Sequence, residues 1–315
     1  MELIRGLHNL RPRHLGCVAT IGAFDGVHHG HRAVLQQVLD KAAELALPSV
    51  VMVFEPLPRE FLAPERGPAR LMSFREKFEA LDALGIDRLL RIRFTHSLRN
   101  MSALDFIERI FVEGLGARCV ILGDDLRFGR DREGGFELMK SQGEVHGFEC
   151  LHTTTLAFDD ERVSSSRIRE ALADGDFSLV ERLLGRPYAI TGKVVRGDQR
   201  GRTLGAPTAN IQLQRRKAPL AGVFAVKVTG AGESALRGVA NVGFRPSVGE
   251  QPRASLEVHL LDFDGDLYGQ RLAVTFCHRI RAEEKFASLD ALQEQIHKDI
   301  AEGRAYFEAE PSNTV

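Results

Sequence analysis

The first half of the chain alternates short apolar runs with helical patterns. Five runs rich in β-branched and other apolar residues occur between about residue 16 and residue 156, and they are CVATIG, SVVMVF, RLLRIRF, RCVILG and FECLHTTTL. Between the first two runs, apolar residues recur at i, i+3 and i+4 spacing from Val34 to Ala42, which predicts a helix with one face on a sheet. Strands joined by such crossovers are typical of a parallel sheet, so we expect a doubly wound α/β fold.

The second half, after Leu184, changes to a period of two. Gly-rich turns separate three alternating runs, VFAVKV (223–228), LEVHLLDF (256–263) and RLAVTFC (271–277). Such strands are typical of a small antiparallel barrel, and NVGFRPS (241–247) is expected to be a turn-rich loop. The last segment predicts a terminal helix that closes or flanks the barrel, with an apolar face made by Leu289, Leu292, Ile296 and Ile300.

Length and composition agree with two globular domains. A chain of 315 residues is long enough for two, and the change of pattern near GRPY predicts domains at 1–185 and 186–315. Hydrophobic and charged residues make up 43% and 27% of the chain, which excludes disorder, collagen and coiled coil. With 42 Lys+Arg and 43 Asp+Glu, no overall field favours nucleic acid or an anionic membrane, so neither is expected as a partner.

The N-terminal residues lack the apolar run of a signal peptide, and no apolar stretch reaches the length of about 18 residues that a membrane span needs. The cytoplasm is therefore the expected compartment. The four cysteines show no C-x-x-C spacing, which argues against a zinc knuckle or a disulfide framework. Each is expected to be a small buried hydrophobe, at Cys17, Cys119, Cys150 and Cys277.

A first motif, TIGAFDGVHHGHRAVL, passes from a predicted strand through a Gly-rich turn into a predicted helix. It places His28 and His31 where the helix begins, beside N–H groups and a positive dipole end that favour phosphate. Gly22, Gly26 and Gly30 would let a nucleotide approach the backbone. Structural histidines without a ligand would give the same H-x-G-H pattern, so the strand, turn and helix context is what indicates a nucleotide site.

Two later segments of the same half indicate the same site. LGDDLRFGRDREGG follows the fourth predicted strand, so Asp125 would lie beyond a carboxyl end of the sheet, although a solvated charged loop is the alternative. In VSSSRIREAL, the hydroxyls of Ser164 to Ser166 precede a helix that bears Arg169. Such hydroxyls could simply cap the helix, but beside arginines they also form a phosphate cradle.

GAFDGVHHGH and SSSRIR, at the two ends of one α/β domain, together resemble the HxGH nucleotidyltransferases. The resemblance implies that the two histidines stabilise the triphosphate of ATP, that the Ser–Arg segment holds the leaving pyrophosphate, and that a substrate phosphate attacks the α-phosphorus. Such a transfer needs charge stabilisation and in-line positioning more than covalent chemistry. The residues implied for this site are Gly22, Phe24, His28, Gly30, His31, Ser164, Ser165, Ser166 and Arg169.

The second half opens with a basic stretch. Between Arg186 and Lys217 there are eight basic residues and one acid, which suggests a phosphate-handling loop, with a basic surface loop as the alternative. P-T-A-N then presents Thr208 and Asn210, whose oxygens project to one side of an extended segment and suit Mg²⁺ shared with phosphates.

The run LEVHLLDF presents a candidate general base. Its period of two puts Leu256, Val258 and Leu260 on one face, with Glu257 and His259 on the other. A glutamate on a solvated sheet face is usually a surface residue. A carboxylate opposite a metal and phosphate loop can also abstract a hydroxyl proton.

GKVVRGDQRGRTLGAPTAN, NVGFRP and EVHLLDFDGDLYG together resemble the riboflavin kinase module. An HxGH half followed by such a barrel is similar to the prokaryotic bifunctional riboflavin kinase/FAD synthetase family, over essentially residues 16–300. The resemblance implies that ATP phosphorylates riboflavin to FMN and that a second ATP adenylates FMN to FAD, with release of pyrophosphate.

The family resemblance also implies roles for single residues. Thr208 and Asn210 would hold Mg²⁺ and ATP, and Glu257 would be the base for the ribityl hydroxyl. Asp125 would lie at the flavin or ATP side of the first site. Further ATP or flavin contacts in the kinase half would be Gly192, Lys193, Gly201, Gly205, Pro207 and Asn241.

Three positions depart from the family pattern. Ser166 and Ser247 stand where Thr is usual, and Leu126 stands where Phe is usual. Serine keeps the hydroxyl, whereas Leu126 lacks an aromatic face for a flavin or adenine ring.

Two other functions fit parts of the sequence. A different HxGH transferase could act on phosphopantetheine, nicotinamide mononucleotide or a sugar-alcohol phosphate, with the barrel as an accessory domain, but P-T-A-N and EVHLLDFDGDLYG argue against it. A flavin-binding regulator or RNA-binding module would have no need of a general base such as Glu257. Incubation with riboflavin, ATP and Mg²⁺, followed by chromatography of the flavins, distinguishes these functions.

Overall fold

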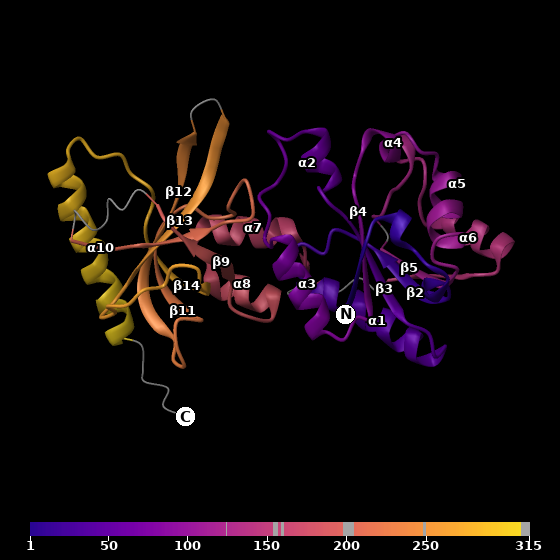
Figure 1. Ribbon diagram of the computed structural model, residues 1–315, viewed down its shortest axis with the longest axis horizontal. Helices are drawn as coiled ribbons and strands as arrows, with labels where there is room; N and C mark the ends of the chain where they lie inside the picture. Colours follow the sequence, from indigo (N-terminus) through magenta and orange to yellow (C-terminus); the bar gives the residue numbers. More distant parts are fainter. Residues whose placement is uncertain (124, 154–156, 159–160, 198–204, 248–249, 310–315) are drawn as a thin grey trace. The chain divides into compact units, whose positions relative to one another are not determined.

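The computed structural model describes residues 1–123, 125–153, 157–158, 161–197, 205–247 and 250–309, and the chain divides into two compact units (Figure 1). The first unit comprises Met1–Pro68 and Arg75–Ser164, and the second comprises Ala69–Phe74 and Ser165–Val315. The domain boundary expected after residue 185 stays a prediction. This division places residues 165–185 in the second unit, together with the barrel.

The first unit is built on a six-stranded parallel sheet in the order β1-β4-β3-β2-β5-β6. The strands are β1 (Glu2–Arg5), β2 (Cys17–Ile21), β3 (Ser49–Phe54), β4 (Arg88–Ile92), β5 (Ala117–Leu122) and β6 (Glu149–His152). All five predicted strands are confirmed. Edge strand β1 was not predicted, because four residues of mixed polarity show no clear period.

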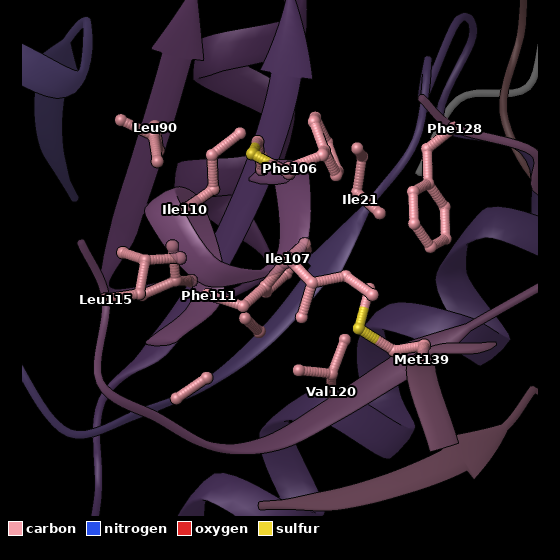
Figure 2. Close-up of a cluster of buried hydrophobic side chains, with 14 of the residues drawn as sticks. Ile21, Leu90, Phe106, Ile107, Ile110, Phe111, Leu115, Val120, Phe128 and Met139 are labelled. Atoms are coloured by element: carbon pink, nitrogen blue, oxygen red, sulfur yellow. The ribbon is translucent and has the colours of Figure 1, made fainter. Parts of the chain in front are cut away.

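Helices cover both faces of this sheet, which confirms the doubly wound α/β fold. On one face, Val38 and Ala42 of helix α1 (His29–Glu44) pack against Val18 and Cys119. The other face is covered by a larger cluster in which Phe106, Ile107 and Phe111 lie with Ile21 and Val120 of the sheet (Figure 2).

Several helices and one two-stranded ribbon complete the described secondary structure of this part of the chain. The helices are α1 (His29–Glu44), α2 (Pro58–Leu62), α3 (Phe74–Ala83), α4 (His96–Arg99), α5 (Ala103–Phe106), α6 (Phe136–His146), η1 (Leu7–Asn9), η2 (Pro12–His14), η3 (Ile107–Val112) and η4 (Arg130–Arg132). Strands β7 (Ala157–Phe158) and β8 (Glu161–Arg162) form an antiparallel ribbon.

The second unit contains a closed antiparallel barrel in the order β10-β13-β12-β11-β14-β9, as the sequence predicted. Its strands are β9 (Ala189–Val195), β10 (Ala209–Gln212), β11 (Gly222–Thr229), β12 (Leu236–Ser247), β13 (Glu250–Leu260) and β14 (Arg271–Arg281). The loop expected at residues 241–247 is wrong, since they complete β12. They pair with β13 from Asn241 opposite Glu257 to Arg245 opposite Arg253, and this pairing outweighs the turn-forming residues.

Among its described residues, the second unit also contains helices α7 (Ser165–Asp174), α8 (Phe177–Leu184) and α10 (Leu289–Ala309). Phe177 of α8 packs on the barrel, with its ring centroid 5.9 Å from that of Phe224 and 6.4 Å from that of Phe276. The terminal helix is confirmed.

The apolar face predicted for α10 is confirmed only in part, because Leu292 and Ile296 are partly buried and Ile300 packs against the core cluster that contains Phe307. Leu289 is 71% exposed, and the buried residues of the helix are Asp299, Gly303 and Phe307. Asp299 is buried because it accepts two hydrogen bonds from Arg281, each 2.8 Å long. A Cβ at position 303 would lie 2.5 Å from Val239 Cγ2, so only glycine lets the helix approach β12 there.

Ala69–Phe74 joins the barrel unit through backbone carbonyls. Arg215 donates to the carbonyl oxygens of Arg70 and Leu71 at 3.2 and 2.9 Å, and the Tyr188 hydroxyl donates to Leu71 at 3.1 Å. Arg169 Nε donates to Ala69 at 2.6 Å. The side chain of Leu71 is fully buried, so this short segment contributes to the core of the second unit.

Cys17 and Cys119 are buried as expected, whereas Cys150 and Cys277 are only partly so, and none of the four forms a disulfide. In the described part of the chain, no helix combines the length and the apolar character needed to cross a membrane.

Candidate functional site

The first candidate site lies at the edge of the parallel sheet where all the strands end. From β2 the chain continues to β3 and β4 on one side, and from β5 to β6 on the other, so the order reverses between β2 and β5. Open α/β sheets bind ligands at this kind of switch point. The loop after β2 leads to His28, and the loop after β5 contains the exposed Asp125, so both predicted segments start at this edge.

His28 and His31 form a stacked pair at the start of α1. His28 is the N-cap residue, and its Nδ1 accepts the backbone N–H of His31 at 3.3 Å. The two rings stack with centroids 3.7 Å apart and planes inclined by 17°. Because Nδ1 of His28 accepts this hydrogen bond from His31, the ring proton is on Nε2, which is the donor nitrogen of the ring.

The surroundings of His31 keep its ring neutral. Burial lowers the pKa of His31 well below its ordinary value of 6.5, and the nearby His28 and Lys77 lower it further. Lys77, on α3, is 1% exposed. The sequence analysis did not select this lysine, because a single lysine on a helix predicts a solvated charge.

The loop between β2 and α1 is folded tightly on itself. Phe24 and Val27 are buried residues with φ of 46° and 42°, a conformation that side chains other than glycine rarely adopt. A Cβ at Gly22 would lie 2.8 Å from the ring of Phe24. The ring centroid of Phe24 lies 5.2 Å from that of His31. Gly22 therefore makes room for Phe24, which packs on a predicted site residue.

Gly30 fits closely against the segment that leads to the serines. A Cβ at Gly30 would lie 3.2 Å from the His28 ring and 3.3 Å from the carbonyl oxygen of Val163. This places Val163, and Ser164 after it, beside the start of α1.

The other residues of the serine and arginine motif belong to the second unit. Ser165 is the first residue of α7, and Ser166 is exposed on it. Arg169 makes the backbone contact with Ala69 described above. Leu126 is partly buried against the core cluster of the first unit, so this position has a packing role.

An aromatic cluster that the sequence analysis missed follows strands β3 and β4. The ring of Phe94 lies 5.5 Å from that of Phe54 and 5.4 Å from that of Phe61, and His96 lies 4.8 Å from Phe61. The three phenylalanines are partly buried. Aromatic residues at or just after the ends of apolar runs were the available indication of this cluster.

The second candidate site lies on the outer face of the barrel. Glu257 of β13 stands opposite Asn210 of β10 and opposite Asn241 of β12, and residues directly opposite share a face. Thr208 Oγ1 lies 3.4 Å from Glu257 Oε2. We call Thr208, Asn210, Asn241 and Glu257 the polar barrel face.

The predicted alternation along β13 is confirmed, because Leu256 and Val258 are each 1% exposed and point into the barrel. The Asn210 side chain lies where a Cβ at Gly197 would be. The polar barrel face presents hydroxyl, amide and carboxylate oxygens, which are the ligands that Mg²⁺ prefers. Among the described residues, no group of three or more His, Cys, Asp and Glu could hold a metal ion.

The other residues predicted for the kinase site differ in exposure and packing. A Cβ at Gly192 would lie 2.5 Å from Ile211 Cγ2, so glycine is required there by the packing of β9 on β10. Lys193 and Pro207 are exposed, and Gly205 has a φ of 77°. Gly201 lies outside the described residues.

Comparison with known proteins matches the two halves separately. The family described as FAD synthetase matches residues 10–167, and the riboflavin kinase family matches residues 184–307. The chain is 52% identical over 305 residues to a bifunctional riboflavin kinase/FMN adenylyltransferase of Pseudomonas fluorescens, covering 97% of each chain. It is 47% identical over 308 residues to the Escherichia coli K12 protein of the same name, covering 98% of each.

A solved structure is also similar along most of the chain. It is described as a macrolide-efflux protein from Streptococcus pneumoniae, and it matches with a TM-score of 0.76 at 30% identity. The match covers 95% of this chain and 97% of that one. Both folds of this chain thus have a likeness in one solved structure, whereas the names of the matching families and relatives differ from the description of that structure.

Proposed function

The chain belongs to the family of bifunctional riboflavin kinase/FMN adenylyltransferases, and on that premise we propose which of its residues perform the two reactions. The protein phosphorylates riboflavin to FMN with ATP, and it adenylates FMN with a second ATP to give FAD and pyrophosphate. Residues 184–307 match the kinase family and residues 10–167 match the FAD synthetase family.

The kinase reaction takes place at the polar barrel face. The observation that supports this is the position of Glu257, between Asn210 and Asn241 and within 3.4 Å of the Thr208 hydroxyl. Glu257 accepts the proton of the terminal ribityl hydroxyl as that oxygen attacks the γ-phosphorus of ATP and ADP leaves. Thr208 and Asn210 hold Mg²⁺, which neutralises phosphate charge when it is bound.

Replacement of Glu257 by glutamine tests the kinase site. Glu257→Gln keeps the size and polarity but cannot accept the proton, so FMN formation should fall by about 10²- to 10⁴-fold. ATP binding should persist. The measurement is flavin chromatography with riboflavin or FMN as the starting flavin, and Glu233→Gln, in the β11–β12 turn, is the matched control. An unchanged kinase rate would reduce Glu257 to a surface residue, and equal loss of both reactions would indicate misfolding.

The adenylyl transfer takes place at the start of α1. Nε2 of His28 donates to a phosphate oxygen, the neutral His31 ring packs beside it, and the N–H groups of the helix start add positive charge. Ser164, which follows the Val163 carbonyl beside Gly30, holds the leaving pyrophosphate, as the family resemblance implies. The same role for Ser165, Ser166 and Arg169 stays a prediction from that resemblance. The isoalloxazine ring of FMN packs on Phe54, Phe61 and Phe94, whose rings are apolar and partly buried at the same sheet edge.

Replacement of His28 by asparagine separates its two roles. Asparagine keeps an N-cap acceptor for α1 but has no group in the place of Nε2. We expect His28→Asn to fold normally and to lose about 10²- to 10³-fold in FAD formation, as for loss of one transition-state donor. His29→Asn is the control at the neighbouring position. FAD formation near the parent rate in His28→Asn would show that His28 serves the helix alone.

We propose the cytoplasm as the site of action. None of the four cysteines forms a disulfide, which suits a reducing compartment. Cell fractionation tests this, since kinase activity released with the periplasmic fraction would refute it.

A further inference from the structure

We propose that His259 is a positioning residue of the kinase, which holds Pro207 and thereby sets the place of Thr208. This inference rests on the proposed role of the polar barrel face. His259 is two residues beyond Glu257 on β13, and its Nδ1 lies 2.9 Å from the carbonyl oxygen of Pro207. Pro207 immediately precedes Thr208, so this contact fixes the backbone beside a proposed metal ligand.

The acceptor in this contact determines which nitrogen of His259 bears the proton. A carbonyl oxygen can only accept, so Nδ1 of His259 must bear the proton and donate. Proline has no backbone N–H and cannot take part in a strand ladder as a donor. Its carbonyl oxygen remains as an acceptor, and the His259 side chain uses it to hold the chain at Pro207 to β13.

The position of the contact shows what it adds to the barrel. The pairing of β10 with β13 ends at Ala209 opposite Val258. By the same register Thr208 stands opposite His259, one step beyond the last ladder pair. The hydrogen bond from His259 to Pro207 thus holds the chain to β13 just before β10 begins, where the backbone pairing of the two strands has ended.

This attachment matters because the contact of the Thr208 hydroxyl with the polar barrel face is long. The hydroxyl lies 3.4 Å from Glu257, at the long end of the range for a hydrogen bond. Loss of the His259 contact would let Pro207 and Thr208 move together away from β13. The defect should appear in binding of the metal and nucleotide and should spare the proton acceptor on β13.

Two substitutions of His259 test the proposal. His259→Leu removes the donor, and His259→Asn places an amide N–H near the position of Nδ1. Because one hydrogen bond is lost, we expect His259→Leu to raise the KM for ATP about 5- to 10-fold. The Kd for MgADP, measured by calorimetry, should rise by the same factor. The kcat should change less than twofold, His259→Asn should restore most of the affinity, and FMN adenylation by the same preparation should be unchanged.

A control and a double variant complete the experiment. His278→Leu removes another barrel histidine, stacked on Tyr306 at 5.0 Å, and should leave ATP binding unchanged. If His259 acts through Thr208, its substitution should add little in a Thr208→Val background. Normal MgADP binding by His259→Leu, no rescue by asparagine, or additive effects in the double variant would overturn the positioning role. Normal MgADP binding by Thr208→Val itself would instead refute the proposed metal site.

Discussion

His31 shows how one side chain links the site to the stability of the first unit. Its pKa is lowered because the ring is buried and lies beside His28 and Lys77. Unfolded, the residue takes up a proton as the pH falls through its ordinary value of 6.5, whereas the folded protein does not. The stability that the neutral ring contributes is therefore complete above that pH and is lost as the pH falls below it.

This loss of stability at low pH leads to a prediction for the pH dependence of unfolding. His31→Asn cannot titrate, so its free energy of unfolding should fall less steeply between pH 7.5 and pH 5 than that of the parent protein. Urea unfolding at a series of pH values measures the two slopes. Equal slopes would mean that His31 has the same pKa folded and unfolded.

At the scale of elements, α10 is held to the barrel by a buried ion pair. Asp299 is 4% exposed and accepts both hydrogen bonds from Arg281, and Gln295 donates to it at 2.9 Å. The pKa of Arg281 is raised, mainly by its hydrogen bonding to the Asp299 carboxylate. A second pair of similar length, Arg304 with Asp262 at 2.7 Å, lies on the surface.

The two pairs provide a matched comparison. Asp299→Asn leaves the half-buried Arg281 without its charge partner, so we expect a loss of about 3–5 kcal/mol in the free energy of unfolding. Asp262→Asn should cost far less, because solvent screens the exposed pair. Denaturant unfolding of both variants measures the difference, and equal losses would contradict the importance of burial.

The same elements show what the sequence could predict. Strands β2 to β6, β11, β13 and β14 were predicted because their apolar residues follow a period that burial dictates. The burial of Asp299 on α10 was not predicted, since its partner Arg281 is on a strand that no local pattern identifies. Residues 241–247 contain Gly and Pro, and only the partner strand shows that they are extended. The histidine and serine motifs were recognised in the sequence, whereas the aromatic cluster depends on strands β3 and β4 lying side by side.

At the scale of the whole molecule, the second unit is discontinuous in sequence. It includes Ala69–Phe74 and helices α7 and α8 as well as the barrel. Phe177 of α8 packs on Phe224 and Phe276, so α8 covers apolar surface of the barrel.

Two fragments test where the kinase unit begins. A fragment of residues 165–315 keeps α7 and α8, whereas one of residues 186–315 exposes Phe224 and Phe276. We expect the longer fragment to unfold at a higher temperature and to make FMN from riboflavin. Thermal unfolding and flavin chromatography of both fragments provide the measurement. Equal stability would favour the boundary after residue 185.

The placement of Leu71 in the second unit also has a consequence for protein synthesis. Leu71 and Arg215 are 144 positions apart, and a ribosome adds roughly 5 to 20 residues per second, so Leu71 is made roughly 7 to 30 seconds before its partner. During that interval the carbonyl oxygen of Leu71 lacks the Arg215 donor that it has in the folded protein. Residues 69–74 can therefore take their final place only after Arg215 has been made, and if the two halves were encoded by separate genes, Arg215 would need another backbone acceptor.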